Sequence, residues 1–181
     1  MQSKQINAFC LPGGKVVFYT GIIPVCENDG GMATVMGHEI GHALARHGSQ
    51  RMAQKKIVGI IQQSAAVSLS DMDPNQQRQV MAVLGIGAQF GILLPYSREH
   101  ESEADHLGVL MMAVAGYDPR YSVTFWQRMA KATGGGKTPE FQSTHPSHET
   151  RVRQLEDWQE EALQIYKSSQ HQQSSRPLPN R

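Results

Sequence analysis

The sequence predicts a mainly α-helical fold with one small β-hairpin, an α+β arrangement in a single domain. Three observations support this prediction. Apolar residues recur at helical spacing over most of the chain, a β-branched and aromatic stretch near the N-terminus flanks a turn, and 39% of the 181 residues are hydrophobic. We expect the domain to cover residues 1–167, followed by a disordered tail at 168–181 that is rich in Gln, Ser and Pro.

The first predicted element is the hairpin. Its strands run from Ile6 to Leu11 and from Lys15 to Thr20, on either side of the turn-forming tripeptide Pro12-Gly13-Gly14. The second strand takes its β-propensity from four successive residues: Val16, Val17, Phe18 and Tyr19.

The first long helix is predicted from Met32 to Arg46, where apolar residues recur three and four apart. Asp29-Gly30-Gly31 precedes it, and Gly48 supplies a stop signal. The segment GHEIGHALARH, residues 37–47, therefore lies largely within this helix.

The middle segment, residues 57–96, has the most unusual composition in the chain. Its only charged residues are Asp71, Asp73 and Arg78, and it divides at Asp73-Pro74 into two apolar-rich helical halves. A packed helical hairpin and a lid or membrane-leaning flap over an active site are both compatible with this pattern. The longest uncharged stretch, Val80 to Tyr96, falls short of the roughly 20 residues that cross a bilayer, so we expect no transmembrane span.

Three further helices are predicted. One runs from about Arg98 to Val114, one from Asp118-Pro119 to about Lys131, and a charge-rich one from Pro146 to about Lys167. A glycine-rich flexible loop at 134–143 separates the last two.

Charge and cysteine content exclude several protein classes. The formal net charge is +1, from 17 Lys and Arg against 16 Asp and Glu, which argues against nucleic acid as a partner. Cys10 and Cys26 are too few for a disulfide framework, although one disulfide between them stays open. The opening residues lack the pattern of a signal peptide, so a secretory signal was removed or never existed.

The strongest chemical signal is the pair His38 and His42. Four residues apart on a helix, their imidazoles project from one face and can bind one ion together. Glu39 points about 100° around the helix and can reach a water on that ion without binding it. This division of labour fits zinc-dependent hydrolysis, in which the metal activates water and a carboxylate takes its proton.

A third ligand is predicted on the helix that begins SREHESEADHLG. Glu101 is placed to bind the ion, and Asp105 lies one turn later, where it can accept a hydrogen bond from a ligating histidine. Glu99 and Glu103 point to the opposite flank, and we expect both to be solvated.

The pair GHEIGHALARH and SREHESEAD resembles the HtpX and CAAX-prenyl-protease family of gluzincin zinc metallopeptidases, which carry HExxH and ExxxD motifs. Ser143-Thr144-His145-Pro146 with Arg151 is similar to the THPxxxxR element of that family, and the resemblance covers about residues 6 to 155. Among its branches, the soluble, envelope-located one exemplified by BepA fits better than the multi-spanning members.

That resemblance implies a zincin-type domain with one Zn²⁺ ion and a location in the bacterial cell envelope, periplasmic or membrane-associated through a missing N-terminal segment. It makes His38, His42 and Glu101 the metal ligands, Glu39 the general base and acid, and Asp105 the residue that orients a ligand. The implied substrates are unfolded or misfolded polypeptides.

The role of His145 stays open among three interpretations. Its imidazole lies in the first turn of the last helix, hydrogen-bonds the oxyanion of the tetrahedral intermediate, or occupies the open zinc position and silences the enzyme. Arg151 supports it, pairs with a buried carboxylate, or is an exposed helix residue. His47 is interpreted as structural, and the remaining histidines are expected at the surface: His100, His106, His148 and His171.

Substrate binding is predicted at the second strand of the hairpin. An extended peptide can add to an edge strand formed by Val16, Val17, Phe18 and Tyr19 if that strand lies beside the metal-binding helix. Gly37 and Gly41 indicate close approach of another backbone, for which the hairpin is one candidate. The alternatives are a zinc-binding, chaperone-like protein with a closed site and a membrane-embedded protease for lipidated peptides, which the missing spans disfavour.

Overall fold

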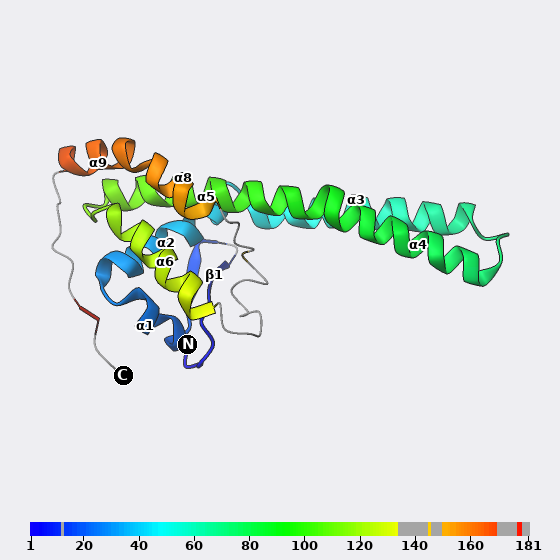
Figure 1. The fold of residues 1–181 in the computed structure, drawn as a ribbon, viewed down its shortest axis with the longest axis horizontal. Coiled ribbons are helices and arrows are strands. Elements are labelled where there is room, and N and C mark those ends of the chain that lie inside the picture. Colours follow the sequence, from blue (N-terminus) through cyan, green and yellow to red (C-terminus); the bar gives the residue numbers. More distant parts are fainter. Residues whose placement is uncertain (12, 134–144, 146–149, 170–176, 179–181) are drawn as a thin grey trace.

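Helices dominate the computed structural model of the chain (Figure 1), which describes residues 1–181 except 12, 134–144, 146–149, 170–176 and 179–181. The predicted glycine-rich loop, the predicted helix start at Pro146, His148, His171 and most of the tail lie outside the described residues. The mainly α-helical fold with one small β element is confirmed.

The hairpin consists of strands β1 (Ala8–Leu11) and β2 (Lys15–Phe18), paired antiparallel with Phe9 opposite Val17. A 3-10 turn, η1 (Thr20–Ile22), and the short helix α1 (Ile23–Cys26) lead from it to helix α2 (Asp29–Leu44). The side chain of Asn28 caps α2 by accepting a hydrogen bond of 2.9 Å from the amide of Gly31. Strand β1 lies beside α2, where Phe9, Cys10 and Leu11 border the same pocket as Glu39 and His42.

Helix α2 ends at Leu44, two residues before the predicted end at Arg46, and a left-handed turn at Arg46 follows it in place of a stop at Gly48. Arg46 adopts φ 57°, ψ 30°, and α3 (His47–Ser68) begins with the next residue, so that Gly48 lies inside the first turn of α3. A left-handed residue reverses the chain within one position. It returns His47 toward the helix that the chain has just left.

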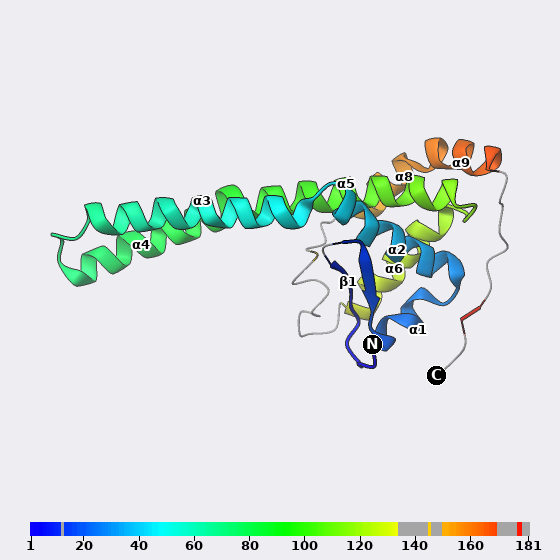
Figure 2. The ribbon, with the colours of Figure 1, turned by 180° about the vertical axis from the view of Figure 1, so that it is seen from behind.

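Helices α3, α4 (Pro74–Ala88) and the π-helix η2 (Gln89–Leu93) form an antiparallel pair that projects from the rest of the molecule (Figures 1 and 2). We call residues 47–93 the helical arm. Asp73 caps α4 by accepting hydrogen bonds from the amides of Asn75 and Gln76, with Pro74 in its first turn. The two helices pack against each other and point away from the domain (Figure 1).

The arm continues without a break into α5 (Leu94–Val114). The resulting helix, Pro74–Val114, has 41 residues. By length and composition it is long and apolar enough to cross a membrane, and the most apolar part of it has no buried residue. The sequence predicted a boundary near Arg98 and no segment of spanning length. The difference arises because η2 joins α4 to α5 without a break in the helix.

The domain is organised around the crossing of α2 and α5. A Cβ atom on Gly37 would lie 2.7 Å from the carbonyl oxygen of Gly108, and one on Gly41 would lie 2.8 Å from that of Ala104. Both glycines therefore permit the close approach of a backbone, as predicted, but the neighbour is α5 and not the hairpin. Because neither position carries a side chain, α2 and α5, the two helices that carry the predicted ligands, can pack closely together.

Helices α6 (Arg120–Thr133), α8 (Arg151–Asp157) and α9 (Gln159–Ser168) complete the core, with a break at Trp158 between the last two. Phe125 of α6 is fully buried. Leu155 of α8 and Val35 of α2 belong to the same hydrophobic cluster. Near the C-terminus, Pro177 forms an isolated antiparallel bridge with Asn28. All of this core lies at the α2 end of the molecule, away from the arm (Figure 2).

Candidate metal centre

Helix α2 supplies two imidazoles on one face. His38 is 1% exposed, and the Nε2 atoms of His38 and His42 lie 3.1 Å apart. Helix α5 crosses at this level and brings in Glu101, which is fully buried. The structure thus brings together the three residues that the sequence predicted as ligands.

His145 joins them as a fourth potential ligand. Its Nδ1 atom lies 3.2 Å from the Nε2 atoms of both His38 and His42, and 3.3 Å from Oε1 of Glu101. The ligand atoms of all four residues lie within 4.8 Å of one another. Among the described residues no other group of three or more metal-binding side chains meets this criterion.

The distances within the group fit a tetrahedral metal ion. Ligands about 2.0–2.1 Å from zinc are separated by about 3.3 Å at the edges of a tetrahedron. Five separations among the three imidazole nitrogens and Oε1 of Glu101 range from 3.1 to 3.3 Å, and Nε2 of His38 lies 3.4 Å from the other carboxylate oxygen, Oε2. Oε1 of Glu101 is buried without a hydrogen-bond partner. A cation between these atoms would satisfy that oxygen and the imidazole lone pairs, so the residues present fit a metal.

Asp105 and Arg151 hold the ligands in place. Nδ1 of His38 lies 2.8 Å from Oδ1 of Asp105, the contact predicted for a carboxylate that orients a ligating histidine. Arg151 is 3% exposed and donates to Oδ2 of Asp105 at 2.6 Å and to Oε2 of Glu101 at 2.9 Å. Its guanidinium also lies 4.0 Å from the centre of the Trp126 ring. Arg151 therefore pairs with buried carboxylates and is not an exposed helix residue.

Burial and charge pull the pKa values of the ligands in different directions. Burial opposes ionisation of Glu101, but the neighbouring imidazoles of His145, His38 and His42 outweigh it and hold the pKa of this carboxyl well below its usual range. Burial lowers the pKa of His42 to about 3, which keeps that imidazole neutral and able to bind a metal. For His38, burial is outweighed by Asp105 and Glu101, which raise its pKa to about 10.

Glu39 lies beside the ligands without joining them. It is 1% exposed, its Oε1 atom has no hydrogen-bond partner, and that atom is 3.5 Å from Nε2 of His145. Glu39, His42 and His145 face a pocket of about 560 Å³, within the usual size range of ligand sites. A buried carboxylate that faces an open pocket is placed to exchange a proton with a bound molecule.

Strand β1, and not β2, borders this pocket. Its lining includes Phe9, Cys10 and Leu11 of β1, whereas the predicted substrate-binding residues lie on the next strand out: Val16, Val17, Phe18 and Tyr19. The prediction placed the wrong strand beside the metal-binding helix, because alternation of apolar residues identifies a strand but not its neighbour.

One residue near the site, His100, was misjudged in the sequence, and His47 and Glu103 have partners that the sequence did not indicate. Nδ1 of His47 lies 2.9 Å from Nδ1 of His42, and its Nε2 lies 3.1 Å from Oε2 of Glu103. His100, expected at the surface, is 4% exposed and stacks on His47 with ring centres 4.1 Å apart. Glu103 is exposed as predicted but is paired with His47. His47 is thus a direct partner of a metal-ligand candidate, which its position five residues after His42 could have suggested.

One question that the sequence left open concerns the two cysteines. Cys10 and Cys26 are both free thiols, so the disulfide left open by the sequence is not formed.

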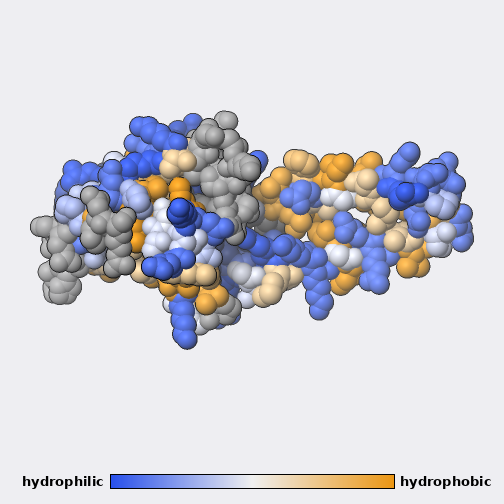
Figure 3. All heavy atoms as spheres, turned by 90° about the horizontal axis from the view of Figure 1, so that it is seen from below, coloured by the Kyte–Doolittle hydropathy of each residue, from blue (hydrophilic) through white to orange (hydrophobic). Residues whose placement is uncertain are grey.

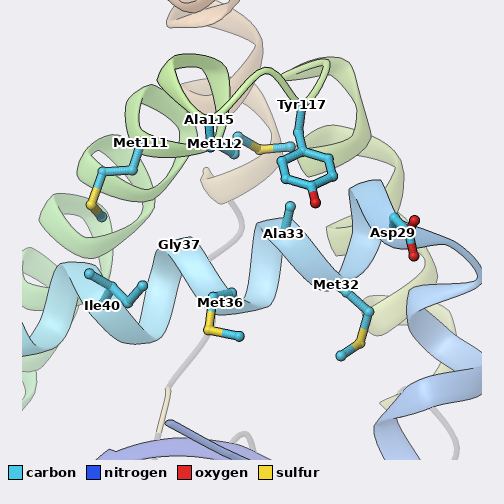
Figure 4. A pocket seen from close by; sticks show the side chains of 10 residues that line it. All are labelled: Asp29, Met32, Ala33, Met36, Gly37, Ile40, Met111, Met112, Ala115 and Tyr117. Carbon is cyan, nitrogen blue, oxygen red and sulfur yellow. The ribbon is translucent and has the colours of Figure 1, made fainter. Parts of the chain in front are cut away.

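A second hollow, of about 290 Å³, lies between α2 and the end of α5 (Figure 4) and is lined by four methionines: Met32, Met36, Met111 and Met112. None of the candidate ligands lines it.

A sequence model of peptidase family M48 matches residues 1–159. The chain belongs to this family. It is 42% identical over 157 residues to the mitochondrial metalloendopeptidase OMA1 of Schizosaccharomyces pombe, covering 86% of this chain and 44% of that protein. It is 38% identical over 167 residues to OMA1 of Arabidopsis thaliana, covering 91% of this chain and 32% of that protein.

A bacterial relative is more distant. This M48 chain is 29% identical over 159 residues to the beta-barrel assembly-enhancing protease of Escherichia coli, covering 84% of the chain and 32% of that protein. The chain therefore spans less than half the length of each of these three relatives. The predicted membership of this group of metallopeptidases is confirmed.

Proposed function

We propose that this M48 chain is a zinc-dependent endopeptidase that hydrolyses peptide bonds of unfolded or misfolded proteins. The observation that carries the proposal is the position of Glu39, a buried carboxylate with an unpartnered oxygen, beside four converging ligand atoms at the wall of an open pocket. A site that only stored a metal would not require such a base.

The chain's own residues divide the proposed reaction among them. A zinc ion bound by His38, His42 and Glu101 supplies Lewis-acid chemistry that makes water acidic and polarises the scissile carbonyl. Glu39 takes the proton from the attacking water and returns it to the leaving amine. Asp105 fixes the ring of His38, and Arg151 balances the charge of two buried carboxylates.

His145 is proposed to restrain the site until substrate arrives. Its Nδ1 atom stands at the same distances from the other ligand atoms as they do from one another, which favours the role of a fourth ligand. If substrate displaces it, its Nε2 side is well placed to hydrogen-bond the oxyanion of the tetrahedral intermediate. The two roles then belong to successive states of one residue.

Substrate is proposed to bind along β1. The amide of Tyr19 donates to the carbonyl of Asn7 at 3.0 Å, which continues the β1–β2 register and directs the peptide groups of Cys10 to the outer edge of the sheet. The amide of the buried Ala8 is already bonded to Oδ1 of Asn7, so pairing would begin at Cys10. That edge faces the pocket that contains Glu39. Main-chain pairing there would accept extended chains of many sequences, which suits unfolded substrates.

The cell envelope of a bacterium is proposed as the location, as the resemblance to the BepA branch implied. The name of the Escherichia coli relative, a beta-barrel assembly-enhancing protease, supports it, whereas the names of the OMA1 relatives point to mitochondria. Recovery of the protein only in cytosolic fractions would overturn this assignment.

The test is zinc content together with cleavage of unfolded casein, comparing the chain with Glu39→Gln and His145→Ala. We expect about one zinc per chain in the wild type and in Glu39→Gln, with cleavage lost at least 100-fold in Glu39→Gln. Faster cleavage by His145→Ala identifies restraint, and slower cleavage identifies a contribution to the transition state.

A zinc-binding, chaperone-like protein is the second candidate. The completed set of four ligand atoms favours it, because structural zinc sites are closed by four protein ligands. It replaces the peptidase proposal if zinc is bound and neither the wild type nor His145→Ala cleaves casein.

A further inference from the structure

The helical arm exposes most of its apolar side chains. Ten large apolar residues are exposed between Ile57 and Ile92, and in the described structure α3 buries only His47 and Val58 while α4 and η2 bury none. Figure 3 shows these apolar side chains spread along the arm. Exposed apolar surface of this extent marks an interaction site in a soluble protein.

The two helices of the arm expose apolar residues in different ways. On α3, Ile57, Ile60 and Ile61 share one face, whereas Lys56 and Gln63 lie seven apart on another. From Val80 to Ala88, α4 has no polar side chain at all. A helix that is apolar on every side is normally buried in protein or in lipid. The arm therefore requires an apolar environment that the described part of the chain does not supply.

The charge of the arm selects the kind of environment. The arm, residues 47–93, carries four basic residues (Arg51, Lys55, Lys56 and Arg78) and two acidic ones, Asp71 and Asp73, and Arg46 and Arg98 lie just outside its two ends. The chain as a whole has a net charge of only +1. Basic residues that flank an apolar helix favour an anionic lipid surface, whereas a second copy of the arm would bring like charges together.

The length of the arm decides how it meets the lipid. The uncharged part of α3, residues 57–68, is about 18 Å long, whereas the uncharged stretch between Arg78 and Arg98 is about 28 Å long and could by itself span a membrane. A hairpin crosses a bilayer only if both of its helices do, and α3 falls short of the roughly 30 Å of a hydrocarbon core. The tip between the two helices carries Asp71 and Asp73. Such a hairpin is suited to lying along the membrane interface with its charges among the headgroups.

We propose that the helical arm is a membrane-docking element that lies in the interface of a bilayer containing anionic lipids. The base of the arm also lines the pocket of Glu39 through Arg46, Ser49, Arg51 and Met52. Docking would therefore place that pocket at the membrane surface. This last consequence, but not the docking itself, rests on the proposed function.

Vesicle flotation tests the proposal, carried out in the Glu39→Gln background so that self-digestion plays no part. We expect the chain to float with vesicles of phosphatidylcholine and phosphatidylglycerol in equal amounts, and about tenfold less with phosphatidylcholine alone. Lys55→Gln with Lys56→Gln should weaken binding by about 25-fold, since each basic residue at an anionic surface contributes about fivefold. Ile61→Ser with Phe90→Ser should weaken it at least tenfold.

Gln63→Ser with Gln79→Ser is the matched control, because both residues are exposed and polar, and it should bind like the parent chain. Circular dichroism shows whether each variant keeps its helices. A second reporter is the indole introduced by Phe90→Trp, which brominated lipids should quench while Trp126 and Trp158, packed in or against the core, stay bright.

Two results would overturn the proposal. One is flotation that is equal for the parent chain and both arm variants. The other is a parent chain that binds no vesicles and sediments as a dimer, with Ile61→Ser and Phe90→Ser restoring the monomer, which would assign the arm to a second copy.

Discussion

The helix Pro74–Val114 runs through two opposite environments. Its first half, in the arm, is apolar and exposed, with Phe90 at 66% exposure, whereas its second half buries Glu101 and Asp105 at 0% and 4%. Burying a carboxylate without partners is strongly unfavourable, and exposing a phenylalanine forfeits the hydrophobic effect. Neither half follows the usual distribution of residues in a folded domain, so each indicates a function: a metal centre at one end and a docking surface at the other.

The largest contrast is expected for two arginines of α8. Arg151→Met leaves Glu101 and Asp105 buried without their partner and should lower the free energy of unfolding by about 3–5 kcal/mol. Arg153→Met, two residues away and exposed, should change it by less than about 0.5 kcal/mol. Urea denaturation of both variants measures the difference. Similar stabilities for the two would show that Arg151 is not essential to the buried carboxylates.

Two phenylalanines compare the core and the arm directly. Phe125 is fully buried, so Phe125→Ala should lower the free energy of unfolding by about 3–5 kcal/mol. Phe90→Ala should leave it nearly unchanged, because the ring of Phe90 is exposed. Thermal unfolding without lipid checks both. A large destabilisation by Phe90→Ala would mean that the arm packs against protein in solution.

Two histidines separate support of the metal from surface pairing. His47→Ala removes the partner of His42 and should weaken zinc binding by about 10- to 100-fold, as loss of such hydrogen bonds does at other metal sites. His106→Ala removes a pair with Glu161 and a stacking contact with Trp158, neither of which touches a ligand candidate, and should leave zinc affinity unchanged. Competition with a chelating dye gives both constants, and His47→Gln should restore part of the loss.

Two glycines are expected to respond with opposite signs. Gly37→Ala places a methyl group 2.7 Å from the Gly108 carbonyl oxygen, so the helices must separate, at a cost of about 1–3 kcal/mol. Gly59→Ala, in α3, meets nothing within 4 Å and should stabilise the chain by about 0.5–1 kcal/mol through helix propensity. Equal effects in a calorimetric comparison would show that the α2–α5 crossing is looser than described.

Local spacing in the sequence located the part of the site that lies on single helices. The separations between His38 and His42 and between Glu101 and Asp105 are fixed by helix geometry, so each pair could be assigned to one face. The resemblance to known metallopeptidases then connected the two helices and added His145 and Arg151. The structure places all six side chains within one buried cluster.

Features that depend on which element packs against which could not be read in the same way. Gly37 and Gly41 indicated a close neighbour, but only the fold shows that it is α5. Likewise, β-propensity identified both strands but not that β1 borders the pocket. The burial of His100 and His47 could not be predicted, because it results from the left-handed turn at Arg46, an unusual conformation for a residue other than glycine.

The most direct test of the central claim, that the α2–α5 crossing builds a metal centre, is zinc-edge X-ray absorption on the zinc-loaded chain. The account predicts nitrogen and oxygen ligands at about 2.0–2.1 Å, strong imidazole scattering and no sulfur. It also predicts one imidazole fewer in His145→Ala and loss of the bound zinc in His38→Ala with His42→Ala. A sulfur ligand at about 2.3 Å, or zinc retained with unchanged scattering in the double variant, would contradict it.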